Sequence, residues 1–437
     1  MTATETTKLL PTSSTTPETN GKSSAGNPFS LVSAIFVALQ AILIPLFIVG
    51  TKYSDTDYDV KEYIAYRDIM AMLLLGFGYL MTFLKCYGLG AVGFTMMLSI
   101  LAMELNIFVE LAVRYFYNKG GELDDDTAWP MPVSMATLID SEFAAATLMI
   151  SFGAVIGRAT PLQMMLIAMS QSVFYAFNKV VLVLGSIQAE DVGGSMTIHM
   201  FGAYFGLAAS YAMGPPSDLT QAGEAGMPDK VSDVLALIGT TILWVFWPSF
   251  VGATETGILE NEHHCIVNTI LALLASTTMT FCLSQMLCHG KFDPVHVANS
   301  TLAGGVAIGS AGRLDIGPGL AISTGALAGA ASVFGYKYSS PYLESKFSIY
   351  DTCGVGNLHG YPSVVGALLS IAFIALDPDA EFLTQDVLPQ MTSQLLGIIA
   401  TLLVSIVSGY GTGALVSSIG GEGLLSYMDS EWWHLEY

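Results

Sequence analysis

The stretch Asp191-Val-Gly-Gly-Ser-Met-Thr-Ile-His199-Met-Phe-Gly-Ala-Tyr-Phe-Gly206 decides the architecture of this chain, because its sparse pattern returns 160 residues later with every internal offset unchanged. Five positions share this spacing, namely Asp191, Gly194, His199, Gly206 and Ser210, which recur as Asp351, Gly354, His359, Gly366 and Ser370. Each histidine lies inside a long apolar run, eight residues after its carboxylate. The chain therefore contains two corresponding halves, each with one ionisable ring inside an apolar segment.

The composition indicates a membrane protein built from helices. Of 437 residues, 52% are hydrophobic and only 12% are charged, whereas a soluble domain carries roughly 25% charged residues. Apolar stretches of about 20 residues, the length that crosses ~30 Å of hydrocarbon, recur along the chain. We count about twelve, over 30–50, 66–86, 89–116, 140–158, 161–186, 194–213, 232–254, 266–288, 294–311, 316–338, 357–376 and 393–415. The alternating pattern of a membrane barrel is absent. We predict an all-α membrane protein with about twelve transmembrane helices in one bundle.

The two histidines at equivalent repeat positions are the candidate central site. Burying an ionisable side chain in a membrane span is costly, so such residues usually mark a substrate or proton path. Corresponding segments of two transporter halves commonly meet at one site near the middle of the bilayer. We therefore expect His199 and His359 to form one site. The alternative is two separate histidines, each hydrogen-bonded in the core.

Metal binding competes for the same pair, because two neutral imidazoles can hold zinc or copper. No third or fourth ligand accompanies them in either segment, and the cysteines show no Cys-x-x-Cys spacing. Asp191 and Asp351 lie about two helical turns from the histidines and are expected to cap helix starts by accepting backbone N–H bonds. That structural role is compatible with cation recognition by the same carboxylates. We expect no metal and no other cofactor.

Charges in the connections set the expected orientation. The net charge is −21. In a twelve-span chain with its N-terminus inside, the acidic clusters fall outside, where they enrich cations or simply solvate the surface. Six basic residues then fall at inner connections and favour this orientation by the positive-inside rule, namely Lys85, Arg158, Lys230, Lys291, Lys337 and Lys346. Four others, Lys52, Lys61, Lys119 and Arg313, fall outside.

The chain is expected to form one membrane domain with two tails. Residues 1–27 are polar and rich in Ser and Thr, so we predict a disordered cytoplasmic tail there. Residues 28–425 form the predicted membrane domain, and residues 426–437 a short C-terminal tail. We expect a multi-pass protein of the plasma membrane, with both termini in the cytoplasm.

Several motifs resemble those of one known family. The stretch that begins at Asp191 resembles the fifth conserved helix of Rh glycoproteins, and Asp351-Thr-Cys-Gly-Val-Gly-Asn-Leu-His359-Gly360 resembles their tenth. Supporting stretches are Gly76-Phe-Gly-Tyr-Leu-Met-Thr-Phe-Leu84, Trp247-Pro-Ser-Phe250, Asn299-Ser-Thr-Leu-Ala-Gly-Gly305 and Pro341-Tyr-Leu-Glu-Ser345. Over roughly residues 30 to 430, the chain is identified as an Rh-type member of the ammonium transporter superfamily.

The resemblance implies a fold and a set of site residues. Family members are trimers in which each subunit has its own pore, made of two five-helix halves of inverted topology. Rh members add an N-terminal helix, which residues 30–50 would supply. His199 and His359 match the histidines of the pore centre, and Phe143 and Phe250 match the stacked phenylalanines of the outer gate. Asp191 matches the structurally important aspartate of the family.

The implied function is conduction of ammonia after recruitment and deprotonation of ammonium, with methylammonium and carbon dioxide as further candidates. A desolvated ammonium ion is costly in a low-dielectric path, whereas neutral imidazoles offer hydrogen-bond donors and acceptors to ammonia. The alternatives are an electrogenic ammonium or proton-coupled transporter and a non-conducting membrane scaffold. The presence of both histidines argues against the scaffold. No nucleophile–base arrangement points to an enzyme, and we expect no nucleic-acid partner.

One position departs from the family pattern. Rh relatives usually have Asn-Glu near the outer end of the fourth core helix, where this chain has Asn178-Lys179. A lysine repels ammonium where an acid attracts it, so recruitment of the cation is in question at this position. The alternative is that Lys179 only extends its ammonium group to the membrane interface.

Overall fold

The computed structural model describes residues 31–55, 60–117, 129–216, 219–255, 259–378, 380, 382–419 and 427–435. The predicted disordered tail, residues 1–27, lies outside the described residues. Within the described part, ten helices are long and apolar enough to cross a membrane. They are Leu31–Gly50, Val60–Phe83, Lys85–Tyr117, Met135–Val155, Pro161–Ser186, Lys230–Glu255, Leu259–Leu287, Gly317–Phe347, Gly356–Ile374 and Val387–Ser417.

The other two predicted spans are also helical, but they are short or interrupted. The first consists of the π-helix η6 (Ser195–Met200) and α7 (Phe201–Ala212). The second consists of α11 (Pro294–Ser300), α12 (Ala303–Ile308) and the 3₁₀ turn η8 (Gly309–Ala311). All twelve predicted segments therefore fold as helix, and the chain is a multi-pass integral membrane protein of the all-α class.

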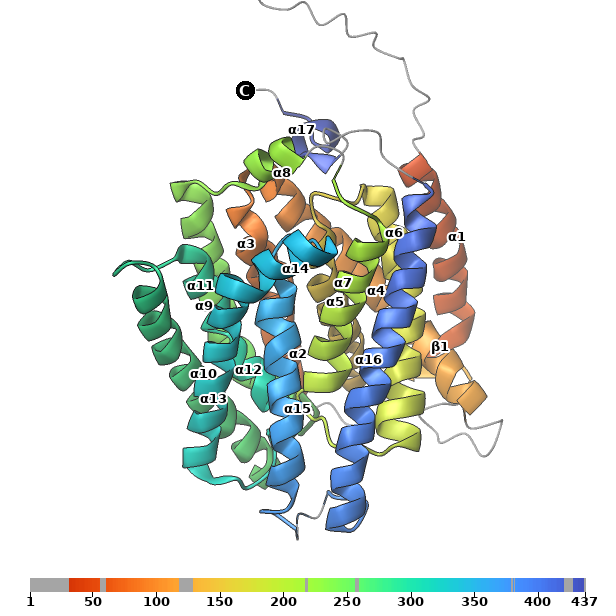
Figure 1. The fold of residues 1–437 in the computed structure, drawn as a ribbon. Helices are drawn as coiled ribbons and strands as arrows, with labels where there is room; N and C mark the ends of the chain where they lie inside the picture. The colour runs from red at the N-terminus through yellow and green to blue at the C-terminus, as the bar shows by residue number, and fades with distance from the viewer. Residues whose placement is uncertain are drawn as a thin grey trace, which may run out of the picture.

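Several long spans are divided where their helical geometry changes, and Figure 1 labels their α-helical parts. The described helical elements in chain order are α1 (Leu31–Gly50), α2 (Val60–Ala71), η1 (Met72–Phe77), α3 (Gly78–Leu80), η2 (Met81–Phe83), η3 (Lys85–Tyr87), α4 (Gly88–Tyr117), α5 (Met135–Val155), α6 (Pro161–Ala176), η5 (Phe177–Ser186), η6, α7, α8 (Leu219–Gly226), α9 (Lys230–Gly252), η7 (Ala253–Glu255), α10 (Leu259–Leu287), α11, α12, η8, α13 (Gly317–Phe334), η9 (Gly335–Ser339), α14 (Ser340–Phe347), η10 (Gly356–Gly360), α15 (Tyr361–Ile374), α16 (Val387–Ser417) and α17 (Asp429–Trp432).

Several helices begin earlier than their apolar stretches. α10 starts at Leu259, whereas the predicted apolar run starts at residue 266. The polar residues between these points include Glu260 and Glu262, which lie in the first turn of the helix. Acidic residues are favourable there, since the free N–H groups carry partial positive charge. Apolar runs mark the hydrocarbon layer, and the helices continue beyond it into the polar zone.

A short parallel pair of strands was not predicted. β1 (Thr51–Tyr53) pairs with β2 (Met131–Val133), with Thr51 opposite Met131. The pair joins the connection after α1 to the connection before α5. Three residues per strand are too few for a recognisable alternation in the sequence, and the pairing partner lies far along the chain.

The predicted repeat is visible in the two histidine-bearing segments. η6 and α7 carry His199, and η10 and α15 carry His359. Both segments begin after a glycine with positive φ, which is 69° at Gly194 and 74° at Gly354. In Figure 1, α7 ends near the face that carries α8, whereas α15 ends at the opposite face. The two segments therefore run in opposite directions through the bundle, as an inverted repeat requires.

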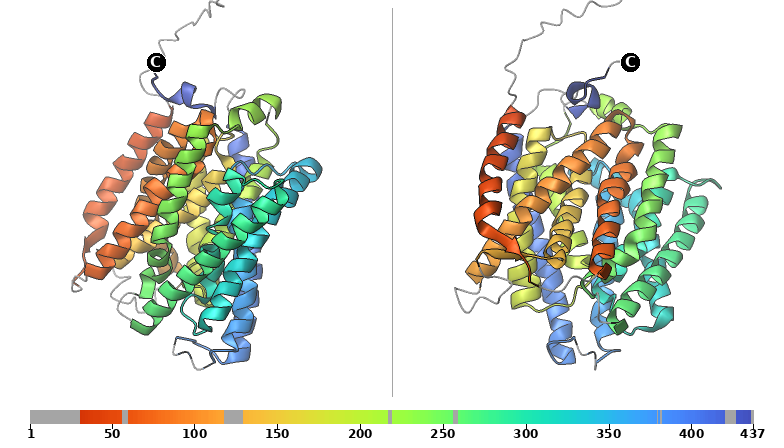
Figure 2. Two further views of the ribbon diagram at one scale, coloured as in Figure 1. Left: turned by 90° about the vertical axis from the view of Figure 1, so that its left-hand side faces the viewer. Right: turned by 180° about the vertical axis from the view of Figure 1, so that it is seen from behind.

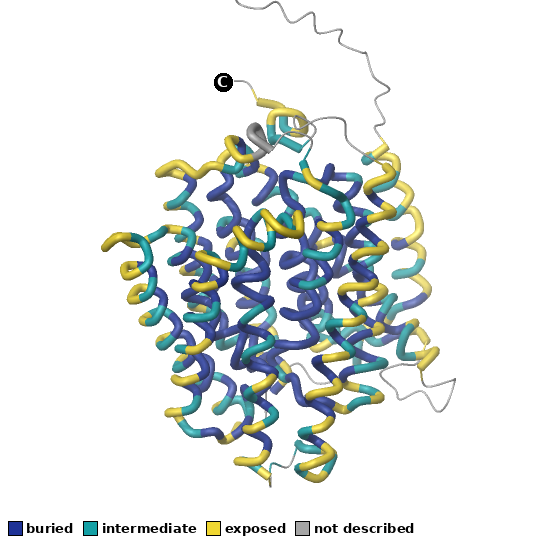
Figure 3. The backbone as a smooth tube through the Cα atoms, viewed as in Figure 1, coloured by how far each residue is buried: buried dark blue, intermediate teal, exposed yellow. Residues whose placement is uncertain are grey.

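Small residues let the central helices pack closely, and Figure 3 shows that the centre is buried. A Cβ atom added to Gly202 of α7 would lie 2.7 Å from the Thr147 carbonyl oxygen of α5. A Cβ atom on Gly409 of α16 would lie 2.3 Å from the Phe205 carbonyl oxygen of α7. Such contacts exclude any larger side chain at these positions. Gly157 has a φ of 72° in the turn after α5, and a Cβ atom there would lie 2.8 Å from the Tyr87 ring.

The N-terminal helix α1 packs along the edge of the bundle, as all views in Figures 1 and 2 show. Only 6% of the residues in its most apolar 18-residue stretch are buried inside the protein. It contacts α4 through a hydrogen bond of 2.7 Å from Gln40 Nε2 to Glu104 Oε2. The rings of Phe47 and Phe108 also meet, with 4.7 Å between their centroids. This helix supplies the additional span that was predicted at 30–50.

Candidate functional site

The two histidines of the repeat meet at the centre of the bundle. The Nδ1 atom of His199 lies 3.1 Å from the Nδ1 atom of His359, and the rings are stacked with 10° between their planes. Each residue is only 2% exposed. A hydrogen bond of this length needs one ring to donate through Nδ1–H and the other to accept. The two rings therefore share one proton between them and cannot both be doubly protonated in this geometry.

Both histidines lie on π-helical turns, which the sequence pattern did not reveal. η6 covers His199, and η10 covers His359. A π-helical turn widens the helix locally and is frequent at functional sites. Here it occurs at the same place in both halves, directly before a regular α-helix.

A file of aromatic rings extends from the histidine pair in both directions. On one side, His199 lies 5.8 Å from Phe250, which lies 5.1 Å from Phe143 in an edge-to-face contact. On the other side, His359 lies 6.2 Å from Phe77 of η1. The structure thus brings Phe143 and Phe250 together, next to the histidines. Phe77 was not singled out from the sequence, although it lies in one of the motifs quoted above.

Two polar atoms in this file have no hydrogen-bond partner among the described residues. They are Nε2 of His199 and Nε1 of Trp247, and both are buried. The Trp247 ring stacks on His199 with 5.7 Å between the centroids. Buried polar atoms are normally satisfied, so these two are available to a small ligand that can hydrogen-bond in an otherwise aromatic surrounding.

Asp191 is bonded as a helix cap. Its carboxylate accepts bonds from the backbone N–H groups of Met196 and Thr197 at 3.0 and 2.7 Å, and from the Thr197 hydroxyl at 2.8 Å. The Ser310 hydroxyl adds a bond of 2.5 Å from the other half of the chain. Burial raises the pKa of Asp191, although these bonds favour its charged form. Its oxygens are thus used within the protein.

Asp351 makes the equivalent cap in the second half, with fewer bonds. It accepts from the backbone N–H groups of Val355 and Gly356 at 2.9 and 2.8 Å. Burial raises its pKa to about 6, and the backbone bonds act in the opposite direction. The two aspartates are therefore similar in their local geometry but unequal in the number of groups that depend on them.

A cavity of about 280 Å³ opens beside Phe143, and we call it the Phe143 vestibule. It contains a set of charged side chains that sequence analysis had not grouped, namely Arg114, Asp140, Lys179, Glu190, Asp191, Glu255 and Arg313. Arg313 joins two of the acids: its Nε lies 2.9 Å from Glu190, and its Nη1 lies 2.9 Å from Glu255. The acids and bases of this cavity come from distant parts of the chain, so spacing alone could not predict the pairs.

Lys179 lies inside this vestibule and does not reach the membrane interface. Its side chain is 10% exposed, and its Nζ lies 2.8 Å from Asp140 Oδ1. The same nitrogen lies 3.4 Å from both carboxylate oxygens of Glu110. The interpretation of Lys179 as an interfacial side chain is therefore wrong, because two carboxylates hold it within the protein.

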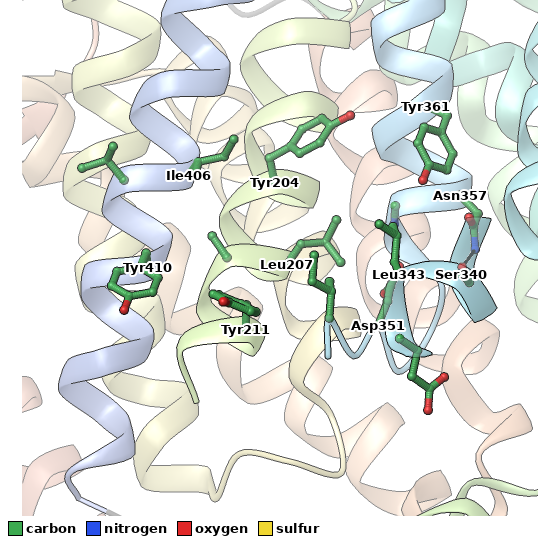
Figure 4. A pocket seen from close by; sticks show the side chains of 15 residues that line it. Tyr204, Leu207, Tyr211, Ser340, Leu343, Asp351, Asn357, Tyr361, Ile406 and Tyr410 are labelled. Atoms are coloured by element: carbon green, nitrogen blue, oxygen red, sulfur yellow. Dashed lines mark hydrogen bonds between the residues drawn. The ribbon is translucent and has the colours of Figure 1, made fainter. Parts of the chain in front are cut away.

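A larger, mostly apolar pocket of about 580 Å³ lies away from the histidines (Figure 4). It is lined by α7, α14, α16 and the start of the second histidine segment, through residues that include Tyr204, Leu207, Leu343, Asn357, Ile406 and Tyr410. Asp351 also lines it, but the carboxylate is bonded to backbone groups. Neither histidine contributes to this pocket, so its size does not make it the site.

One group of potential metal ligands lies elsewhere in the described part of the chain. The ligand atoms of Cys288, Asp293 and His296 lie within 4.8 Å of one another. Asp293 caps α11 through Val295 N–H at 2.9 Å, and His296 Nδ1 lies 3.2 Å from Ser284 Oγ. The histidine pair itself has no third described ligand of this kind. The expectation of no metal remains a prediction for both places.

The comparison with known proteins gives the same family as the motifs. The profile of the Ammonium Transporter Family matches residues 29–432. The chain belongs to the ammonium transporter family. Its relatives in this family include the ammonium transporter Rh type B of Bos taurus, which is 40% identical over 369 residues, 81% of this chain and 78% of that protein. The Rh type B protein of Homo sapiens is 39% identical over 381 residues, 84% of this chain and 80% of that protein.

Solved structures of the ammonium transporter family share this fold. Rh50 of Nitrosomonas europaea superposes with a TM-score of 0.73 at 35% identity, over 86% of this chain and 93% of that chain. Mep2 of Saccharomyces cerevisiae superposes with a TM-score of 0.64 at 19% identity, over 82% of this chain and 88% of that chain, which shows a common fold only. The Rh-type assignment made from the motifs is confirmed.

Proposed function

We propose that this protein conducts ammonia through the path that contains His199 and His359. Ammonium that reaches the Phe143 vestibule gives its proton to water on that side, and neutral ammonia continues past Phe143 and Phe250. The observation that carries the proposal is the 3.1 Å contact between two buried imidazoles, one of which has an unpartnered Nε2. Membership of the ammonium transporter family supports the same substrate.

The shared proton gives the pair complementary hydrogen-bonding ends. The ring that donates through Nδ1–H has an Nε2 that accepts, and the ring that accepts through Nδ1 has an Nε2–H that donates. Ammonia can both donate and accept hydrogen bonds, so it matches both ends. A neutral exchange of the two roles requires one proton to cross between the Nδ1 atoms and a second proton to leave one Nε2 and be replaced at the other, so that each ring keeps one N–H.

The surroundings of the pair favour a neutral molecule. The rings adjoining the histidines belong to Phe250, Trp247 and Phe77, and no described carboxylate is hydrogen-bonded to either imidazole. Moving a lone unit charge into such surroundings costs several kcal/mol even after relaxation. Aromatic faces stabilise a cation by only about 1–2 kcal/mol, so they do not offset that cost.

We expect the flux to increase with external pH, because the fraction of ammonia increases, and to be independent of membrane voltage. A potential of about 100 mV changes the energy of one fully translocated charge by about 2.3 kcal/mol, whereas a neutral molecule is unaffected. Uptake and current should be measured together in proteoliposomes of the purified protein. Saturating, voltage-driven currents would instead support net ammonium transport or ammonia movement with a separately relayed proton.

We propose that Phe143 and Phe250 form the gate of this path. Their rings are 4% and 3% exposed and meet edge-to-face between the vestibule and His199. Replacing Phe250 with alanine should admit water and small hydrated ions, because the apolar ring between Phe143 and His199 is removed. Stopped-flow water permeability should rise severalfold in this variant. Phe281, an exposed ring, gives the matched control, and equal water permeability of Phe250→Ala and wild type would exclude a gate.

Assembly, location and the wider substrate range rest on the family resemblance. We propose a homotrimer in the plasma membrane with both termini in the cytoplasm. The beginning of α1 and α17 lie at the same face of the bundle (Figure 1), which agrees with an even number of spans. Methylammonium is proposed as a transported analogue. Carbon dioxide is included because it is neutral and the path is lined mainly by aromatic rings.

A further inference from the structure

Four charged side chains meet at the edge of the Phe143 vestibule. Arg114, Asp140 and Lys179 line it, and Glu110 lines a neighbouring cavity. Lys179 contacts Asp140 at 2.8 Å and Glu110 at 3.4 Å, and Glu110 contacts Arg114 at 2.6 Å. Two acids face two bases, so the group is neutral overall. The side chain of Glu110 is 8% exposed and that of Lys179 is 10% exposed, which means that this pairing takes place out of bulk water.

The two carboxylates converge on one nitrogen. Both oxygens of Glu110 and one oxygen of Asp140 lie within 3.4 Å of Lys179 Nζ. A primary ammonium group and a free ammonium ion have the same charge, a tetrahedral nitrogen and N–H donors that carboxylates accept. We propose that Glu110 and Asp140 form a cation site suited to a small ammonium ion and that the Lys179 side chain of the same chain permanently occupies it.

The neighbouring acids of the vestibule do not offer an alternative site. Glu190 and Glu255 are both bonded to Arg313, and Asp191 uses its oxygens on backbone N–H and hydroxyl groups. Each described carboxylate that lines the cavity is therefore already engaged. Removal of Lys179 would leave Asp140 open to the cavity without its described partner, since Asp140 lines the cavity with 36% of its side chain exposed.

This arrangement sets how strongly these acids attract a cation at the entrance of the path. With Lys179 in place, Glu110 and Asp140 are both paired, and this pair of acids has no uncompensated charge for a further cation. Without Lys179, the group carries a net charge of minus one next to the cavity that leads to Phe143. The inference rests on the proposed function, because it describes how the substrate of that path is collected.

Lys179→Gln tests this inference through the uptake of labelled methylammonium into proteoliposomes. We expect the half-saturating concentration to fall about tenfold relative to wild type, since an uncompensated charge a few ångströms away attracts a cation by at least this amount. Ammonium chloride should also raise the melting temperature of the purified variant above the value in equal sodium chloride, and it should not do so for wild type.

The double variant Lys179→Gln/Asp140→Asn is the matched control, because it also removes the acid that lines the cavity, restores neutrality and should show no gain. Loss of one partner of a buried pair is destabilising. If Lys179→Gln does not fold, Lys179→Met, which keeps the apolar stem, is measured instead. An unchanged half-saturating concentration in the single variant, or an equal gain in the double variant, would overturn the inference. Absence of uptake by wild type would instead overturn the proposed function.

Discussion

Alanine in place of both His199 and His359 is expected to reduce ammonia conductance at least tenfold, with the folded assembly intact. The substitutions remove the buried donor and acceptor groups that ammonia meets at the centre, and an unpaired buried polar group costs about 1–3 kcal/mol. The surrounding rings of Phe250, Trp247 and Phe77 offer no equivalent groups except the indole N–H. Conductance should be measured by stopped-flow pH change in proteoliposomes that contain equal amounts of protein.

The single variants test whether the pair acts as a unit. Either His199→Ala or His359→Ala leaves the other ring without the partner at 3.1 Å. Each single variant should therefore show most of the loss of conductance expected for the double variant. His289 is exposed in the connection after α10, and His289→Ala is the control that should conduct normally. Full conductance by the double variant would contradict the assignment of His199 and His359 as the central site.

Asp191→Ala is expected to lower thermal stability and expression strongly, together with transport. The substitution leaves the N–H groups of Met196 and Thr197 and two hydroxyl groups without their acceptor, at about 1–3 kcal/mol for each buried donor that stays unsatisfied. The loss should be measured as a lower melting temperature of the purified protein in detergent. Asp191→Asn should be milder, because an amide oxygen can still cap the segment.

Asp351→Ala provides the internal comparison. The Asp351 side chain accepts two described hydrogen bonds from backbone N–H groups, whereas Asp191 accepts more, including one from the Ser310 hydroxyl. We expect the melting temperature to fall less for Asp351→Ala than for Asp191→Ala. A normally folded Asp191→Ala variant that lost only substrate affinity would favour direct binding of ammonium by this carboxylate.

The repeat made the central part of the fold predictable from sequence. Equal offsets from Asp191 to His199 and from Asp351 to His359 indicated equivalent segments, and the structure places the two rings in contact. The segments 194–213 and 294–311 were recognised as apolar, but their interruptions were not. Apolar content reports on burial in lipid or protein, whereas a π-helical turn depends on hydrogen bonds that leave no clear compositional mark.

The charged part of the vestibule was not predictable in the same way. Lys179 attracted attention only as a departure from the family pattern, and its partner Glu110 was not considered. These two residues lie 69 positions apart, and Arg313 lies 123 positions from Glu190. Without a repeat or a fixed spacing, a single sequence contains no information about which acid meets which base across helices.

The opposite course of the two histidine segments has a consequence for the direction of flow. A molecule that enters from the Phe143 side meets the His199 ring and then the His359 ring, and a molecule from the other side meets the same two rings in reverse order. In either arrangement of the proton shared across the 3.1 Å contact, one outer Nε2 donates and the other accepts, so a molecule from either side meets one donor and one acceptor at the centre. The pair therefore provides no rectification, and reversing the ammonia gradient across the membrane reverses the flux without any change in the protein.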